Sequence, residues 1–383
     1  MKITNDIKYV GVNDHQIDLF EGQYKVPHGM SYNSYVILDD QIAVMDSVDK
    51  SFGQEWLDNI EKVTEGRAPS YLIVQHMEPD HSSNIALFLS KYTTCKVVAS
   101  KQAFMMMKNF YGDDYADRQI VVKEGDFLNL GHHNLFFIAA PMVHWPEVMM
   151  TYDETEEALF TADAFGKFGA LDYEEAWEDE ARRYYFGIVG KYGGPVQTLL
   201  QKVVGIEFYY ILPLHGPVLT GDLHNYIRLY SHWSNYTPEE DGVVIAYCSI
   251  YGHTKEAVVL LERELKKYGV KVVTHDLARC DMAEAVADAF KYNKLCLASV
   301  TYNADIFPFM KTFINHLTLR NFKNRTVGFI ENGSWAPTAA NTMKKMLDGA
   351  QNLTFLDTKV TIKSSLNDAN KEAIAKLAEE FLK

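Results

Sequence analysis

Four side chains of the kinds that bind metal ions lie within six residues of this sequence, His76-Met77-Glu78-Pro79-Asp80-His81. They follow an apolar run, SYLIVQH (70–76), which predicts a buried strand. In an extended segment His76, Glu78 and Asp80 would face one side. His81 would face the other, and a turn after the strand can spread all four around two ions. A polar loop with chance histidines is the simpler interpretation, but four such residues directly after a buried strand weigh against it. The motif therefore predicts the centre of a two-metal site.

Three more candidate ligands stand at the ends of predicted strands. His144 lies in APMVHWPE, Asp163 ends ALFTAD, and His215 lies in LPLHGP. A sheet can bring such strand ends together in space, so these side chains are expected to converge on the motif. His224 is an alternative to His215 as the last ligand. Because His224 falls inside a helical pattern, His215 is favoured.

Short apolar runs separated by polar turns make the first half of the chain strand-rich. Residues 34–48 predict two strands around the turn Asp39-Asp40. The acidic stretch 171–185 predicts a helix that leads into a second one near 195–204. His132 and His133 are adjacent in a predicted turn, and we interpret both as solvated.

The boundary between two domains is expected in SNYTPEEDG (234–242), which is polar and contains Pro and Gly. We therefore predict one domain over 1–241 and a second over 242–383. After the boundary, apolar runs alternate with amphipathic ones, which is typical of a parallel, doubly wound α/β domain. The predicted strands are 243–249, 271–277, 294–302 and 325–331, and the predicted helices are 255–269, 281–291, 309–320, 338–350 and 367–382.

Charge and cysteine content narrow the function classes. The formal net charge of −14 argues against nucleic acid or an anionic membrane as the main partner, because both attract basic proteins. The four cysteines form no C-x-x-C pair, so they predict neither a cysteine-bound metal cluster nor a disulfide framework. The N-terminus lacks the pattern of a secretory signal, and no run of about 20 apolar residues is present. A cytoplasmic location is therefore expected.

A second candidate site opens the C-terminal domain. The segment Ser249-Ile250-Tyr251-Gly252-His253-Thr254 follows a predicted strand and precedes the helix that begins near Lys255. Backbone N–H groups at a helix N-terminus, together with hydroxyl side chains, form a phosphate cradle. An ordinary helix-capping turn has the same residue types, and the segment lacks the lysine of a P-loop and the glycines of a dinucleotide fold.

Two later loops strengthen the prediction of a ligand site. They follow predicted parallel strands, at whose carboxyl ends doubly wound sheets bind ligands. Aromatic side chains in these loops could flank a planar ring, although Trp335 could instead be a core residue. Together the three loops resemble the FMN site of flavodoxin-like domains. The candidate residues in the later loops are Thr301, Tyr302, Asn303, Ala304, Asn332, Gly333, Ser334 and Trp335.

The metal motif resembles that of the metallo-β-lactamase fold, His-x-His-x-Asp-His followed by separate His, Asp and His. Here Glu78 replaces the second histidine. A carboxylate added to imidazoles shifts the preference from zinc toward iron or manganese. With a flavodoxin-like domain behind it, the chain resembles the flavodiiron proteins, a family of oxygen and nitric oxide reductases. This resemblance implies an α/β fold with an N-terminal metallo-β-lactamase-like αββα sandwich and a C-terminal flavodoxin-like doubly wound parallel sheet.

The resemblance also implies a ligand set for two non-haem iron ions. His76, Glu78 and His144 would bind one iron. Asp80, His81 and His215 would bind the other. Asp163 would bridge the two, while His81 is the least secure member because a histidine there does not always bind metal in this family.

By the same resemblance, the protein would reduce O2 to water with four electrons, or NO to N2O, at the di-iron site fed by FMN. The chain ends after the flavodoxin-like part, so an external donor is expected, either a rubredoxin-like protein or a reduced deazaflavin. The resemblance further implies a head-to-tail homodimer. Two other interpretations stay open: a zinc-dependent hydrolase with an accessory flavodoxin domain, and an electron carrier that uses FMN alone.

Overall fold

The computed structural model describes residues 3–383, so the first two residues of the predicted N-terminal domain lie outside it. The chain forms two compact units, Met1–Ser231 and His232–Lys383. The division falls inside helix α7 (Leu223–Asn235). The residues after α7 are tied to the C-terminal unit, because Arg325 Nη1 donates to the carbonyl of Tyr236 at 2.8 Å. The domain boundary at 241/242 stays a prediction.

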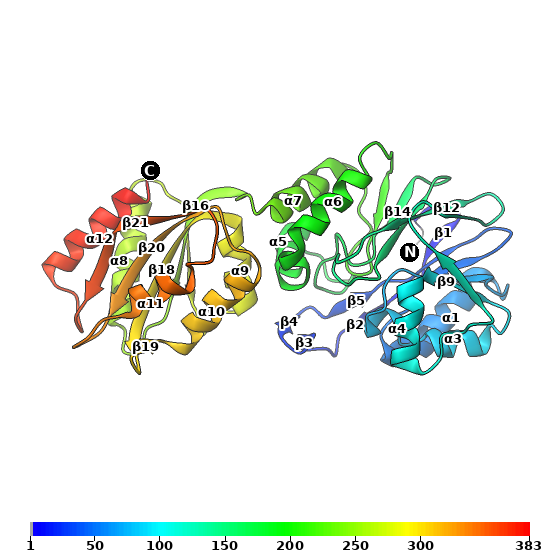
Figure 1. Cartoon of the computed structure of the whole chain (residues 1–383), viewed down its shortest axis with the longest axis horizontal. Coiled ribbons are helices and arrows are strands. Elements are labelled where there is room, and N and C mark those ends of the chain that lie inside the picture. Colours follow the sequence, from blue (N-terminus) through cyan, green and yellow to red (C-terminus); the bar gives the residue numbers. More distant parts are fainter. Residues whose placement is uncertain (1–2) are drawn as a thin grey trace. The chain divides into compact units, whose positions relative to one another are not determined.

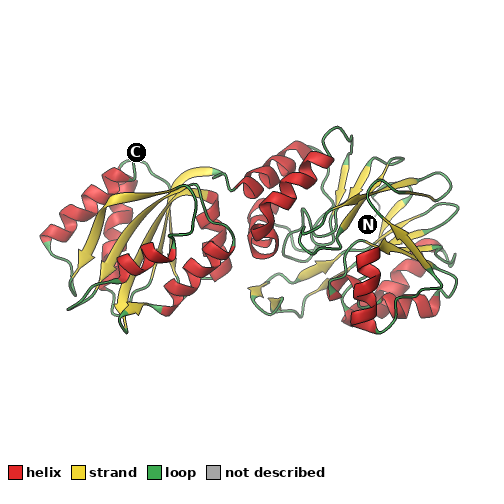
Figure 2. Cartoon of the chain, in the orientation of Figure 1, coloured by secondary structure: helices red, strands yellow, loops and turns green. Residues whose placement is uncertain are grey.

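Two sheets form the centre of the N-terminal unit (Figures 1 and 2). In the first sheet β1, β6 and β7 are antiparallel, and β7 to β10 are parallel. In the second, β11 to β14 are antiparallel and β15 joins β14 in parallel. The first sheet consists of β1 (Ile7–Tyr9), β6 (Tyr35–Ile37), β7 (Ala43–Met45), β8 (Tyr71–Val74), β9 (Lys96–Ser100) and β10 (Gln119–Val122). The second consists of β11 (Phe127–Asn129), β12 (Asn134–Ala139), β13 (Met149–Asp153), β14 (Ala158–Phe160) and β15 (Tyr210–Leu212).

The core of this unit lies between the two sheets. Ile73 and Val98 of the first sheet belong to the same buried cluster as Phe137 and Phe160 of the second. In such a sandwich each sheet turns one apolar face inward, because side chains along a strand point alternately to the two faces of the sheet. The two strands predicted around Asp39-Asp40 are confirmed as β6 and β7.

Helices and two small two-stranded sheets complete the N-terminal unit (Figure 1). The small sheets pair β2 (Val12–Asp14) with β5 (Met30–Tyr32), and β3 (Leu19–Phe20) with β4 (Tyr24–Lys25). The helices are α1 (Gly53–Thr64) after a 3-10 turn η1 (Lys50–Phe52), α2 (Pro79–Ser82), α3 (Ile85–Lys91), α4 (Lys101–Tyr111), α5 (Trp177–Tyr184), a π-helical segment η2 (Tyr185–Val189), a 3-10 turn η3 (Gly190–Tyr192), α6 (Gly193–Lys202) and α7.

The helix predicted over 171–185 is wrong in its first part, since α5 begins only at Trp177. Tertiary contacts hold the preceding residues in a loop. The backbone N–H of Leu171 donates to Asn13 Oδ1 at 2.9 Å, and Glu175 forms an ion pair with Lys167 at 2.6 Å. Acidic composition alone could not reveal these partners.

The C-terminal unit is a parallel sheet in the order β17-β16-β18-β20-β21, with helices on both faces (Figure 2). This is the flavodoxin-like order. Helices α8 and α12 pack on one face, where Leu261 and Leu377 share a buried cluster with Ile245. The strands are β16 (Glu240–Tyr247), β17 (Val272–Asp276), β18 (Tyr292–Tyr302), β20 (Arg325–Asn332) and β21 (Leu353–Ile362), with β19 (Asp305–Ile306) beside β18. The helices are α8 (His253–Lys267), α9 (Met282–Lys291), α10 (Pro308–Leu319), α11 (Ala339–Met346) and α12 (Asp368–Glu380).

Strand β21 was not predicted from the sequence. Much of it is only half-buried, and polar residues interrupt its apolar ones, as expected for a strand at the edge of a sheet. The predicted doubly wound architecture is nevertheless confirmed.

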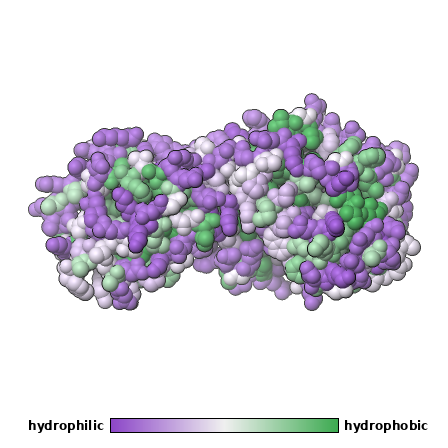
Figure 3. All heavy atoms as spheres, in the orientation of Figure 1, coloured by the Kyte–Doolittle hydropathy of each residue, from purple (hydrophilic) through white to green (hydrophobic). Residues whose placement is uncertain are grey.

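The visible surface is mostly hydrophilic, with hydrophobic residues gathered in separate patches (Figure 3). None of the helices within residues 3–383 is long and apolar enough to cross a membrane.

Candidate metal and flavin sites

The motif that follows β8 turns sharply as soon as the strand ends. Pro79 begins the single helical turn α2, a position that suits proline because its missing N–H would have no partner there. Asp46, at the end of β7, anchors the approach to this turn. Its Oδ1 accepts hydrogen bonds from the backbone N–H groups of Gln75 at 2.7 Å and His76 at 3.3 Å. Local geometry therefore spreads the four motif side chains, as the sequence predicts.

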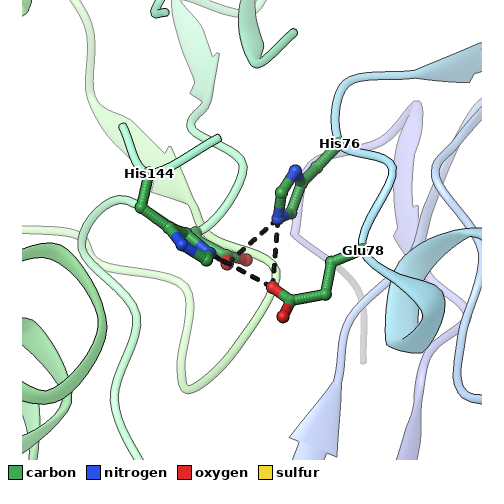
Figure 4. A group of neighbouring side chains, drawn as sticks. His76, Glu78 and His144 are labelled. Atoms are coloured by element: carbon green, nitrogen blue, oxygen red, sulfur yellow. Dashed lines mark hydrogen bonds and ion pairs between the residues drawn. The ribbon is translucent and has the colours of Figure 1, made fainter. Parts of the chain in front are cut away.

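Four side chains form one group of potential ligands. Glu78 Oε2 lies 3.2 Å from His76 Nε2 and 3.1 Å from His144 Nε2. Asp163 Oδ2 lies 3.0 Å from His144 Nε2 and 3.5 Å from His76 Nε2. Figure 4 shows His76 and Glu78, which come from one segment of the chain, converging with His144, which comes from another. Their donor atoms all lie within 4.8 Å of one another, which is close enough for one ion to contact them all.

A second group consists of Asp80, His81 and His215. The Nε2 atoms of His81 and His215 are 2.9 Å apart, and each lies 3.3 Å from Asp80 Oδ2. The structure thus brings His81 and His215 together, whereas His224 lies exposed on α7 and outside this group.

Asp163 lies between the two groups. While its Oδ2 faces His144 and His76, its Oδ1 lies 3.3 Å from His81 Nε2 and 3.8 Å from His215 Nε2. The carboxylate is buried. One oxygen per group is the arrangement that a bridging carboxylate requires.

The residues present fit a pair of cations. Both oxygens of Asp80 and Oδ1 of Asp163 are buried and have no hydrogen-bond partner among the described residues. Buried carboxylate oxygens are costly unless a donor or a cation compensates them. The mixed imidazole and carboxylate donors suit iron or manganese better than a thiolate-preferring ion.

The site's electrostatics favour charged side chains. Burial opposes a charge on His144, but its hydrogen bonds to Asp163 and Glu78 outweigh burial and raise its pKa to about 9. Burial likewise opposes a charge on Glu78, yet the two imidazoles hold the pKa of its carboxyl well below the usual value. Despite burial, Asp163 and other neighbouring carboxylates also raise the pKa of His76 and His81.

These shifts predict proton release on metal binding. In the metal-free protein at pH 7, histidines with a raised pKa carry protons that an ion must displace. We expect binding of two Co²⁺ ions to release more than one proton per chain at pH 7, and the affinity to rise with pH through the pKa of His144, about 9. Calorimetry in buffers of different ionisation enthalpy measures this number. Equal heats in all buffers would contradict the prediction.

Several residues near the metal groups were missed by sequence reasoning. Glu147 is fully buried, and its Oε1 lies 2.9 Å from His76 Nδ1. Tyr184, whose ring lies 5.5 Å from that of His215, has a buried hydroxyl without a hydrogen-bond partner among residues 3–383. Neither they nor Asp46 carry a sequence signal, because only the tertiary fold places them beside the ligands.

The interpretation of His132 and His133 as solvated holds for His132 and is wrong for His133. The His133 side chain is buried, and its Nδ1 lies 2.7 Å from Asp153 Oδ2. Its backbone N–H also donates to Asp39 Oδ2 at 2.7 Å. The turn therefore folds back onto the sandwich, which adjacent histidines in a sequence cannot show.

In the C-terminal unit, a cavity of about 800 Å³ lies at the carboxyl ends of β16, β18 and β20. All the predicted flavin-site residues line it except Gly252. Gly252 instead precedes α8 with a φ of 100°, a conformation that favours glycine. The lining residues that were not predicted are Val300, Ala336, Thr338 and Ser364.

Hydrogen bonds fix the shape of the cavity loops. Ser249 Oγ accepts from the backbone N–H groups of Gly252 and Lys255, both at 3.2 Å. Thr301 Oγ1 accepts from the N–H of Thr338 at 2.9 Å and so joins two of the three loops. Trp335 is 91% exposed, which excludes the core interpretation of this residue.

The cavity fits a phosphorylated planar ligand. Thr254 Oγ1 is buried at the start of α8 and has no hydrogen-bond partner among the described residues, so it is free to contact a phosphate placed there. The cavity volume is in the range of cofactor sites. Exposed rings of Tyr251 and Trp335 stand at its rim.

This assignment predicts a selective loss in Thr254→Val. Removing one hydrogen bond to a charged phosphate should weaken FMN binding about 10- to 100-fold. Riboflavin, which has no phosphate, should bind the variant and the unmodified protein equally. Titration of flavin fluorescence measures both constants, and an equal loss for the two ligands would place the phosphate elsewhere.

The two units define a class of protein: a β-lactamase-like domain with a two-ion donor set, followed by a flavodoxin-like domain. Residues 30–216 match the model of the ODP family beta lactamase. A nitric oxide reductase of Moorella thermoacetica is 27% identical over 360 residues, which cover 91% of this chain and 90% of that protein.

Solved structures are similar over the whole chain. Rubredoxin oxygen:oxidoreductase from Desulfovibrio gigas has a TM-score of 0.92 at 24% identity, covering 100% of this chain and 97% of its own. The flavodiiron protein from Giardia intestinalis has a TM-score of 0.88 at 24% identity, with 100% and 96% covered. The chain is thus similar, over nearly its whole length, to a nitric oxide reductase in sequence and to flavodiiron proteins in fold.

Proposed function

We propose that this chain is an oxidoreductase that reduces O2 to water, NO to N2O, or both, at a di-iron site supplied with electrons by FMN. The observation that carries the proposal is the position of Asp163, whose two oxygens face two equal sets of donors. The cavity in the second unit would hold the flavin that supplies the electrons. The names of the relatives, nitric oxide reductase and rubredoxin oxygen:oxidoreductase, support both substrates.

We propose the following ligand set. His76, Glu78 and His144 bind one iron, Asp80, His81 and His215 bind the other, and Asp163 bridges them. When bound, FMN can pass on electrons one at a time, and the two irons can take up a diatomic gas and hold two electrons. O2 needs four electrons and four protons to give two waters, whereas two NO need two electrons and two protons to give N2O and one water.

The chain's own residues orient and enclose this chemistry. Three of the ligand side chains have no exposed surface, those of His76, His81 and His215. Bulk water therefore has little access to the part of the site that these imidazoles form. Excluding water keeps partly reduced oxygen species within the site. Glu78 and Asp80, at 14% and 13% exposure, are the most accessible members of the two groups. The gas is therefore expected to enter on their side.

Anaerobic stopped-flow mixing tests the function. Protein with measured iron and FMN content is reduced and then mixed with O2 or with NO. We expect the flavin to reoxidise faster than flavin bound to a metal-free sample, with water or N2O as the product. Reoxidation at the metal-free rate with both gases would contradict the proposal.

The zinc hydrolase is the less favoured alternative, because Glu78 adds a carboxylate where the β-lactamase pattern has a histidine. Metal analysis separates the two functions. Two zinc ions per chain, together with hydrolysis of a thioester or lactam, would support the hydrolase.

We further propose that an external donor, a rubredoxin-like protein or a reduced deazaflavin, reduces the FMN. We also propose a head-to-tail homodimer in the cytoplasm. The D. gigas relative's name, rubredoxin oxygen:oxidoreductase, supports the first donor. Light scattering after size-exclusion chromatography tests the dimer, and steady-state gas consumption with each donor tests the electron source.

A further inference from the structure

The two proposed ion positions have the same directly facing donors. The first has two imidazoles, those of His76 and His144, and one carboxylate of its own, Glu78. The second has the imidazoles of His81 and His215 and the carboxylate of Asp80. Each also receives one oxygen of Asp163 at distances between 3.0 and 3.8 Å. Nothing in these donors makes one position bind an ion better than the other.

The partners behind the imidazoles differ. His76 Nδ1 lies 2.9 Å from the carboxylate oxygen Glu147 Oε1. His215 Nδ1 instead lies 2.7 Å from the backbone carbonyl oxygen of Ser31. Nδ1 of His81 is buried and has no hydrogen-bond partner within the part of the chain described. Among these hydrogen-bond partners, a carboxylate therefore lies behind the first position and a neutral carbonyl behind the second.

The structure holds Glu147 firmly in this role. Its side chain has no exposed surface. The same Oε1 atom also accepts a hydrogen bond from the backbone N–H of Met77 at 2.8 Å, which ties the carboxylate to the metal-binding turn. Because Glu147 lies two residues before β13 (Met149–Asp153), the sandwich fixes its backbone: the N–H of Met149 donates to the carbonyl of Gln75 at 3.1 Å.

We propose that Glu147 is a positioning residue that makes the two ion positions unequal. By accepting the Nδ1–H of His76, its carboxylate fixes the tautomer that leaves Nε2 free for the ion and makes this imidazole a stronger donor. The position beside Glu78 and His144 then binds the first ion and holds it more tightly. This inference rests on the ligand set given under the proposed function.

Stepwise metal binding to the full chain tests the inference. The probe is Co²⁺ added without oxygen to metal-free protein that carries its flavin. We expect two binding steps in the unmodified protein. Glu147→Gln removes the charge while keeping an oxygen acceptor of the same length. Since loss of such an outer partner typically costs about 10- to 100-fold in metal affinity, the first step should weaken by that factor and approach the second.

A matched control is available in the same domain. Asp153 is also a buried carboxylate beside the Nδ1 of a buried histidine, at 2.7 Å from His133, but it belongs to neither ion position. Asp153→Asn should leave both Co²⁺ steps unchanged. Two equal steps in the unmodified protein, or unchanged steps in Glu147→Gln, would overturn the inference. No Co²⁺ binding at all would instead overturn the ligand set.

A second measurement needs no variant and so does not depend on how Glu147→Gln folds. In protein labelled with ¹⁵N-histidine, bound Co²⁺ shifts the Nδ1–H signals of the histidines it contacts. One equivalent should shift the signal of His76 and leave that of His215 in place. Equal shifts of the two signals at one equivalent, or an earlier shift of the His215 signal, would overturn the proposal.

Discussion

Asp163→Asn is expected to empty the metal site and to abolish fast reoxidation of the flavin by O2 or NO. The substitution removes the one carboxylate whose oxygens face both groups, at 3.0 Å from His144 Nε2 and 3.3 Å from His81 Nε2. It also turns an amide N–H₂ toward one set of imidazole nitrogens. Loss of a residue that only hydrogen-bonds to a ligand typically lowers metal affinity about 10- to 100-fold. Loss of a ligand that both ions share should therefore lower the affinity by more than about 100-fold.

Iron content by mass spectrometry and anaerobic stopped-flow measure the two effects of Asp163→Asn. FMN content should stay unchanged, because the flavin cavity lies in the other unit. Asp153→Asn again serves as the control, since it changes a buried carboxylate of the same domain away from the ion positions. Two irons and an unchanged reoxidation rate in Asp163→Asn would refute the bridging role.

Glu78→His is expected to change which metal the protein selects. The substitution restores the histidine of the β-lactamase pattern and removes the carboxylate that lies 3.2 Å from His76 Nε2 and 3.1 Å from His144 Nε2. Three imidazoles and one shared carboxylate oxygen then face the first ion, a donor set that suits zinc better than iron. When Fe²⁺ and Zn²⁺ compete at equal concentrations, we expect the ratio of bound Zn to bound Fe to rise at least about tenfold. A change in a single residue around a metal typically has an effect of this size on metal affinity.

Glu78→Asp is the matched comparison, because it keeps an oxygen donor with a shorter reach. Its Zn:Fe ratio should stay closer to that of the unmodified protein, although its total metal content falls. If Glu78→His and Glu78→Asp gave the same ratio, Glu78 would not be the residue that decides between a zinc hydrolase and a di-iron oxidoreductase.

Sequence reasoning worked where a function requires a local pattern. Strand, turn and ligand types at 70–81 are adjacent along the chain, so their order alone predicted the turn that now carries Asp80 and His81. The alternation of strands and helices after residue 242 was equally local, and it predicted the doubly wound sheet. The loop that contains Ser249 and Thr254 was placed correctly at a helix N-terminus for the same reason.

Sequence reasoning failed where a residue's environment comes from a distant segment. The first part of the 171–185 helix was wrong because Asn13 and Lys167 hold that stretch as a loop. The burial of His133 could not be predicted, because nothing nearby in the sequence indicates its partner Asp153. The sequence did not predict the edge strand β21, because the strand pairs on one side only, with β20, and is only partly buried. Its apolar residues therefore do not form the continuous run that marks a central strand.

By itself, the sequence determined which kinds of donor this protein has and which strands end on them. Glu78 in the motif favoured iron over zinc, and the later loops indicated a flavin. Only the tertiary structure decided how the donors divide into two groups, that Asp163 turns one oxygen toward each, and that Glu147 stands behind His76. The physical reason is that ligand atoms must meet within a few ångströms. His76 and His215 are 139 positions apart along the chain, and the packing of two sheets on a shared core is what brings such residues together.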